Sequence, residues 1–143
     1  MYLLKLDILN LKLGRKINST ISTCIMRQII PMETSDLKTI CCEALDDLKA
    51  QNILVLDIQD ISDFADWFII ATASSSRNAR AISNKLIELI KAHQQHLVGI
   101  EGEDDSEWIL VDCGDVIVNI MQKEVREFYD LEGLWGEKTL VSA

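Results

Sequence analysis

A chain of 143 residues has room for one domain built around one hydrophobic core. Its composition, 48% hydrophobic and 26% charged with a single proline, is typical of a packed protein and argues against a disordered one. A net charge of −9 repels phosphate backbones, and no apolar stretch approaches the roughly 18 residues of a membrane-spanning helix, so we expect a soluble protein without direct sequence-specific nucleic-acid binding.

The charge is unevenly distributed along the chain. Residues 1–31 hold five basic residues and one acidic residue, so residues 32–143 hold nine basic and 22 acidic residues, a formal charge of −13. Charged residues interrupt the first segment too often for a secretory signal. We interpret residues 1–31 as an N-terminal extension outside the fold, with Met32 as the natural start of the domain; an organelle targeting peptide is the alternative. The acidic domain would attract a basic protein partner.

The domain begins with a predicted helix and two strands. From residue 36 to residue 48 the apolar positions recur with helical spacing, and Ser35 and Asp36 can cap the start of this helix. Short runs rich in β-branched residues predict strands at residues 53–58 and 66–72, with a polar turn between them.

The middle of the chain predicts a second helix and a short strand. Serines at residues 74–76 can cap a helix in which the apolar positions of residues 79–93 again follow helical spacing. Residues 97–101 predict the third strand. The acidic residues 102–106 that follow are expected to form a solvated surface loop.

Two more strands and a last helix complete the prediction. Residues 108–113 and 116–121 are β-rich runs joined by Gly114 and Asp115, which is the pattern of a tight hairpin. A helix is predicted from residue 123 to residue 131. The order α-β-β-α-β-β-β-α combines hairpin links with a helical crossover, so we predict an α/β fold with a mixed sheet of about five strands and flanking helices.

The four cysteines indicate a reducing compartment. Cys24, Cys41, Cys42 and Cys113 show neither CxxC spacing nor the density of a secreted disulfide scaffold, so we expect a cytoplasmic protein. Cys41 would lie on the apolar face of a helix and Cys113 at the end of a strand. Both are predicted to be buried as small hydrophobic side chains.

No set of polar residues forms a recognisable catalytic or metal site. Asp112 and Asp115 bracket the hairpin, where acidic side chains commonly bond backbone amides, although paired acids can also bind a divalent metal. His93 and His96 lack a third ligand at a useful spacing. The serines at residues 74–76 lack the G-x-S-x-G context of a nucleophile. We therefore predict no catalytic residue, no metal and no cofactor.

The aromatic residues near the C-terminus suggest a protein interface. On the strand 108–113, alternation places Trp108, Leu110 and Asp112 on one face, and because that face ends in a charged residue we expect it to be the more exposed one. Trp108 is then a candidate contact residue, since large aromatics often dominate binding energies. Burial of Trp108 in the core is the alternative.

Several blocks of sequence resemble the ribosomal silencing factors of the Iojap-like family. The resemblance spans roughly residues 36–136. The blocks are Asp66-Trp-Phe-Ile-Ile-Ala-Thr-Ala-Ser74, Ser76-Arg77, Glu101-Gly102, Trp108-Ile-Leu-Val-Asp-Cys-Gly-Asp-Val-Ile-Val118, and Arg126-x-Phe-Tyr-x-Leu-Glu-x-Leu-Trp135. Two positions depart from the family's pattern: Ala73 replaces a common glycine, and Asn119 replaces a common histidine, which removes a group able to titrate near neutral pH.

The resemblance implies a non-enzymatic repressor of translation. Members have an α/β fold likened to nucleotidyltransferases, often form homodimers, and bind the large ribosomal subunit through the fourteenth protein of its L series, a basic protein. The bound factor sterically blocks the small subunit when nutrients are limited. A large-subunit assembly factor is one alternative. A nucleotidyltransferase-like enzyme using Asp112 and Asp115 is another, although Ala73 removes the glycine of a phosphate-binding turn.

The predicted partner-binding residues follow from the signature blocks and from the strand alternation. They are Trp108, Leu110, Asp112, Asn119 and Tyr129. Residues 32–143 are expected to form the ribosomal silencing factor domain that carries them.

Overall fold

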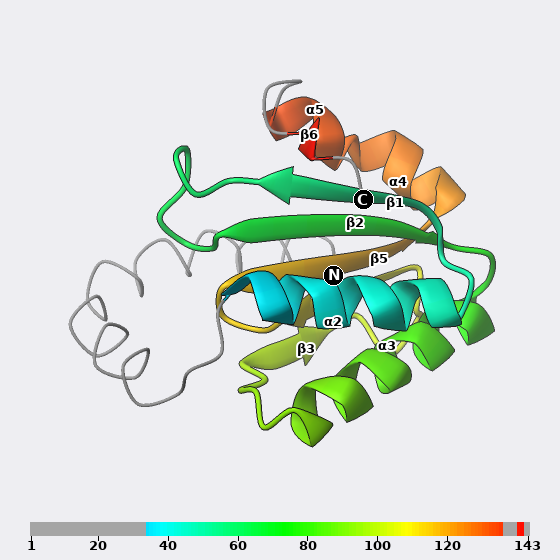
Figure 1. Ribbon diagram of the computed structural model, residues 1–143. Coiled ribbons are helices and arrows are strands. Elements are labelled where there is room, and N and C mark those ends of the chain that lie inside the picture. The colour runs from blue at the N-terminus through cyan, green and yellow to red at the C-terminus, as the bar shows by residue number, and fades with distance from the viewer. Residues whose placement is uncertain (1–33, 136–139, 142–143) are drawn as a thin grey trace.

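The computed structural model describes residues 34–135 and 140–141 (Figure 1). The extension predicted at residues 1–31, together with Met32, lies outside the described residues. The elements are α2 (Thr34–Asp47), β1 (Gln51–Asp57), β2 (Trp67–Ala73), α3 (Ser76–Ala92), β3 (Gly99–Glu101), β4 (Trp108–Asp112), β5 (Val116–Gln122), α4 (Lys123–Tyr129), α5 (Leu131–Trp135) and β6 (Leu140–Val141).

The strands form one mixed sheet in the order β3-β4-β5-β2-β1-β6. β2 and β5 pair in parallel at the centre, and every other neighbouring pair is antiparallel. The parallel pair is possible because the chain crosses over through α3 between β2 and β3. The predicted mixed sheet with flanking helices is confirmed. β6, a two-residue edge strand beside β1, was not predicted.

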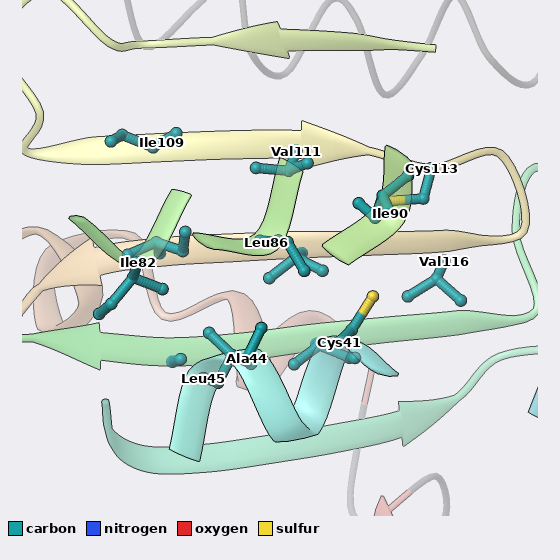
Figure 2. Packing of buried hydrophobic residues seen from close by; sticks show 14 of the residues in the cluster. Cys41, Ala44, Leu45, Ile82, Leu86, Ile90, Ile109, Val111, Cys113 and Val116 are labelled. Atoms are coloured by element: carbon teal, nitrogen blue, oxygen red, sulfur yellow. The ribbon is translucent and has the colours of Figure 1, made fainter. Parts of the chain in front are cut away.

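One face of the sheet packs against α2 and α3, which lie side by side in Figure 1. The two helices direct their apolar stripes at residues of β2, β4 and β5 that alternate along each strand. Figure 2 shows this layer, in which the labelled side chains are Cys41, Ala44, Leu45, Ile82, Leu86, Ile90, Ile109, Val111, Cys113 and Val116. None of the helices within residues 34–135 is long and apolar enough to cross a membrane.

The opposite face of the sheet carries a second, smaller core beneath α4 and α5. The other alternating set of strand residues is buried there together with Phe64 from the loop after β1 and Leu131 from α5. The Trp135 ring lies 5.8 Å from the ring of Phe64 and 5.5 Å from that of Phe68. Helices therefore cover both faces, which explains why the central strands are continuous apolar runs.

The helix ends differ in part from the prediction. Ser75 caps α3, and its hydroxyl accepts a hydrogen bond from the backbone N–H of Asn78 at 3.1 Å. α2 begins at Thr34, so Ser35 and Asp36 lie within its first turn instead of preceding it. The predicted last helix is divided, because Asp130 adopts a left-handed conformation with φ of 42°. The chain turns there, and a separate α5 follows.

Two cysteines are buried as predicted. Cys41 on α2 and Cys113 after β4 are free thiols inside the core between the helices and the sheet (Figure 2). A hydrogen bond to the Cys113 side chain, together with burial, raises the pKa of the Cys41 thiol above its ordinary value. The Cys41 side chain therefore stays protonated and behaves as a small hydrophobic group. Cys24 lies outside the described residues.

Candidate docking surface

The strand face that was expected to be exposed is buried. Trp108 and Leu110 are 0% and 1% exposed, and Asp112 is 4% exposed, so the predicted exposure of this face is wrong. The reason is that α4 and α5 cover it, with Val125 and Tyr129 packed against the same core. In the folded chain, neither Trp108 nor Leu110 presents its side chain to solvent.

A hydrogen-bonded chain connects the buried members of the predicted site. The Trp108 indole Nε1 donates to Oδ1 of Asn119 at 3.0 Å, and Nδ2 of Asn119 donates to the carbonyl of Ile69 at 3.4 Å. Asn119 is 0% exposed, so both polar ends of its amide find partners inside the sheet. The structure therefore brings Trp108 and Asn119 together as internal support across three strands.

Tyr129 joins this group from the surface side. Its ring lies 5.2 Å from the Trp108 ring, centroid to centroid, and its side chain is half-buried. Leu110 is directly opposite Asn119 in the β4–β5 pair and belongs to the same core as Trp108. Of the five predicted residues, Tyr129 alone reaches solvent to a substantial extent.

Asp112 is separate from the other four and stabilises the hairpin. Its Oδ1 accepts a hydrogen bond from the backbone N–H of Gly114 at 2.9 Å, and Gly114 has the positive φ of 87° that favours glycine. This is the turn chemistry expected for an acid at that position. Within residues 34–135 and 140–141, no group of three or more His, Cys, Asp or Glu side chains is arranged to hold a metal ion.

Two exposed apolar side chains on α4 and α5 were not among the predicted partner-binding residues. Phe128 is 80% exposed and Leu134 is 71% exposed. The edge-to-face contact of Phe128 with Tyr129, at 5.0 Å between ring centroids, makes the two rings one continuous aromatic surface. The helical spacing of Val125 and Tyr129 already indicated which side of α4 faces inward, so the outward position of Phe128 could have been found from it.

Exposed acidic residues lie on the same short segment of the chain as these apolar side chains. Glu124, Glu127 and Asp130 are all exposed on α4 or at its end. We call the outer side of α4 and α5, with Phe128, Leu134 and these acids, the C-terminal surface. Protein-binding sites commonly combine exposed apolar side chains with polar or charged ones.

Comparison with known proteins gives consistent results. The sequence model of a family described as "Ribosomal silencing factor during starvation" matches residues 31–143. A protein of Chromobacterium violaceum described as ribosomal silencing factor RsfS is 38% identical over 105 residues, which cover 73% of this chain and 86% of that protein.

A solved structure and a mitochondrial protein are also similar. A crystal structure from Chromobacterium violaceum superposes with a TM-score of 0.72 and 36% identity, covering 78% of this chain and 94% of that one. The mouse protein "Mitochondrial assembly of ribosomal large subunit protein 1" is 33% identical over 90 residues, which cover 61% of this chain and 40% of the mouse protein.

Proposed function

This chain belongs to the ribosomal silencing factor family, and on that premise we propose that it binds the large ribosomal subunit and prevents the small subunit from joining. The proposed contact is the basic fourteenth protein of the L series, and the result is repression of translation in the cytoplasm when nutrients are limited. Residues 32–143 would be the binding domain, with residues 1–31 as an extension outside it.

The observation that carries this proposal is the exposed C-terminal surface. Phe128 and Leu134 place two large apolar side chains in solvent, and burying them against a partner would remove this apolar surface from water. The exposed acids of α4 and the formal charge of −13 over residues 32–143 complement a basic protein, whereas they repel bare rRNA phosphates. A basic protein partner on the subunit surface fits both properties.

The five predicted residues take three different roles in this proposal. Tyr129 contacts the partner beside Phe128. Trp108, Asn119 and Leu110 support Tyr129 from beneath, because they fill the core on which its ring rests. Asp112 acts at a distance by holding the hairpin between β4 and β5.

The proposed mechanism is steric and needs no chemical step. A domain of this size docked on the joining face of the large subunit occupies volume that the small subunit requires. Asp112, which the enzymatic alternative would use for metal binding, already has a carboxylate oxygen bonded to the Gly114 amide. We therefore propose a binding protein without catalytic activity.

Large-subunit assembly is a second candidate function, favoured by the name of the mouse relative. It would use the same surface on the same subunit. The two functions differ in timing, because an assembly factor acts on incomplete subunits and a silencing factor acts on finished ones.

A subunit-joining assay tests the proposal. Purified large and small subunits are mixed with increasing amounts of the protein, and the fraction sedimenting as joined ribosomes is measured. We expect this fraction to fall while the protein co-sediments with large subunits. Normal joining by large subunits saturated with the protein would exclude silencing, and accumulation of incomplete large subunits in depleted cells would then support the assembly function.

A matched pair of variants locates the contact. Phe128→Ser should raise the concentration needed for half inhibition by about tenfold or more, because it removes an exposed aromatic contact. Val98→Ser changes another exposed apolar residue, 40% exposed, which precedes β3 at the far edge of the sheet. Val98→Ser should leave inhibition unchanged. If the two variants had equal effects, the C-terminal surface would not be the contact with the large subunit. Light scattering of both variants would then show whether this surface instead binds a second copy of the chain.

A further inference from the structure

Apolar packing alone does little to fix the position of α4. The helix follows β5 without an intervening loop, since Gln122 ends the strand and Lys123 begins the helix. No residue of α4 is fully buried, and α5 buries only Leu131. Val125 and Tyr129 pack partly against the core. Trp135 of α5 packs against Phe64 and Phe68. A polar interaction between α4 and the sheet supplements this limited apolar packing.

Arg126 supplies that interaction from the middle of α4. Its Nη1 donates to the carbonyl of Asn52 at 2.7 Å and to Oγ1 of Thr72 at 2.8 Å, and its Nε donates to the carboxylate of Glu132. One guanidinium thus joins α4 to β1, to β2 and to α5. The planar fork of arginine suits such a set of acceptors, whereas an ammonium group is a single point charge.

The groups around Arg126 shield its side chain from water and accept its hydrogen bonds. The side chains of Arg126 and Glu132 are only 13% and 29% exposed, so this pair is largely shielded from water. Asn52 has a positive φ of 49°, at a register shift in the β1–β2 pair, and its carbonyl accepts from the guanidinium. Thr72, the third acceptor, is 6% exposed on the inner strand β2.

We infer that Arg126 is a positioning residue for docking, because it fixes α4 and α5 on the sheet and thereby fixes Phe128 and Leu134 relative to each other. The two apolar residues lie on either side of the turn at Asp130. The Arg126–Glu132 pair spans that turn and holds both helices at once. This inference rests on the proposed function for the docking step, whereas the positioning itself is a property of the free protein.

A general stabilising role is the competing interpretation. A shielded ion pair contributes little net stability compared with apolar groups of the same volume, and in some proteins such a pair serves to specify one geometry. A positioning role therefore predicts that loss of Arg126 changes binding and the local order of α4 and α5 far more than it changes the rest of the fold. A general role predicts a uniform change.

The test compares Arg126→Met with Lys123→Met. Both variants remove one positive charge from α4, but Lys123 is exposed and pairs only loosely with Glu127 at 3.9 Å. Affinity for purified large subunits and amide hydrogen exchange are measured for each, at a temperature where melting curves show the variant to be folded. Arg126→Met should weaken binding about tenfold or more and speed exchange in residues 123–135 by at least about tenfold, with little change in β2 and β5. Lys123→Met should stay within about twofold of the unchanged protein in both measurements.

Each other outcome has a definite meaning. Unchanged affinity of folded Arg126→Met, or exchange accelerated equally across the sheet, would overturn the inference. If the unchanged protein fails to bind large subunits, the proposed function is lost, and the exchange measurement still decides the positioning role. If Arg126→Met does not fold, Arg126→Lys is tested in its place. Its affinity for large subunits should fall about three- to fivefold, because lysine lacks the planar fork of arginine. The inference would be overturned if the affinity and the hydrogen exchange of Arg126→Lys both equalled those of the unchanged protein.

Discussion

The two faces of the sheet are covered in different ways. On one face, α2 and α3 bury a broad apolar layer against the strands, with Ile82, Leu86 and Ile90 of α3 all 0% exposed. On the other face, the short helices α4 and α5 contribute few buried side chains, and the hydrogen bonds of Arg126 join α4 to β1, β2 and α5. The strongly packed face provides stability, and the lightly packed face is free to present apolar residues to a partner.

Truncation of Trp108 tests whether the sheet itself is equally packed on both faces. Trp108→Ala removes a fully buried ring and the donor to Asn119, so it should lower the free energy of unfolding by ~3–5 kcal/mol. Chemical denaturation measures the change. A loss below ~1 kcal/mol would mean that the core beneath α4 and α5 is loose throughout, and that Trp108 is available for direct contact after all.

Truncation of Leu86 gives the corresponding value for the α2–α3 face. Leu86→Ala leaves a cavity between α3 and the sheet and should cost ~2–5 kcal/mol of stability. Thermal and denaturant melts should agree on the size of the loss. Subunit binding by the fraction that remains folded should be unchanged, because this face lies opposite the C-terminal surface.

Raising the pH should destabilise the packing of α2 and α3 against the sheet, because Cys41 is buried there. The hydrogen bond with Cys113 and burial raise the pKa of Cys41 above its ordinary value of 9.0, so the folded protein keeps a proton that the unfolded chain releases above about pH 9. The contribution of Cys41 to the free energy of unfolding is fully present below pH 9. It decreases as the pH rises further, by up to ~1.4 kcal/mol per pH unit. Denaturation at pH 8 and pH 10 should show a smaller decline for Cys41→Ala than for the unchanged protein. An identical decline in the two proteins would contradict the raised pKa of Cys41.

The smallest effect on folding is expected at the C-terminal surface. Leu134 is 71% exposed, so Leu134→Ser should change the free energy of unfolding by less than ~0.5 kcal/mol. Binding to large subunits should nevertheless weaken by about five- to tenfold, because an apolar contact is lost. A stability loss comparable to that of Leu86→Ala would show that the two faces are not so different.

Most of the fold could be predicted from local sequence patterns. The periodicities of two and 3.6 identified the strands β1 to β5 and the helices α2 and α3, and the serine cap of α3 followed from its residue type. The division between α4 and α5 could not be read in this way. Asp130 adopts a left-handed conformation in a segment whose apolar spacing continues on both sides.

The site was predicted less well than the fold, for a physical reason. In β4 both alternating sets are apolar, Trp108 and Leu110 on one face and Ile109 and Val111 on the other, so alternation cannot tell which face is covered. The charge of Asp112 suggested exposure, yet the carboxylate is satisfied locally by Gly114. The network of Arg126 depends on a carbonyl at residue 52 and a hydroxyl at residue 72, contacts that only the tertiary fold creates.

The parallel pairing of β2 with β5 also determines the order in which the protein can fold. β2 ends at Ala73 and β5 begins at Val116, so the central pair closes a long loop, while β1–β2 and β4–β5 are local hairpins. Closing that loop is the entropically expensive step, and such non-local pairing slows folding. During synthesis, the inner strand β2 leaves the ribosome with one edge unpaired and must wait for β5. Until then Phe68 and Ile70 lack the cover that they have in the folded protein, which is complete only after the segment that forms α4 and α5 has also emerged.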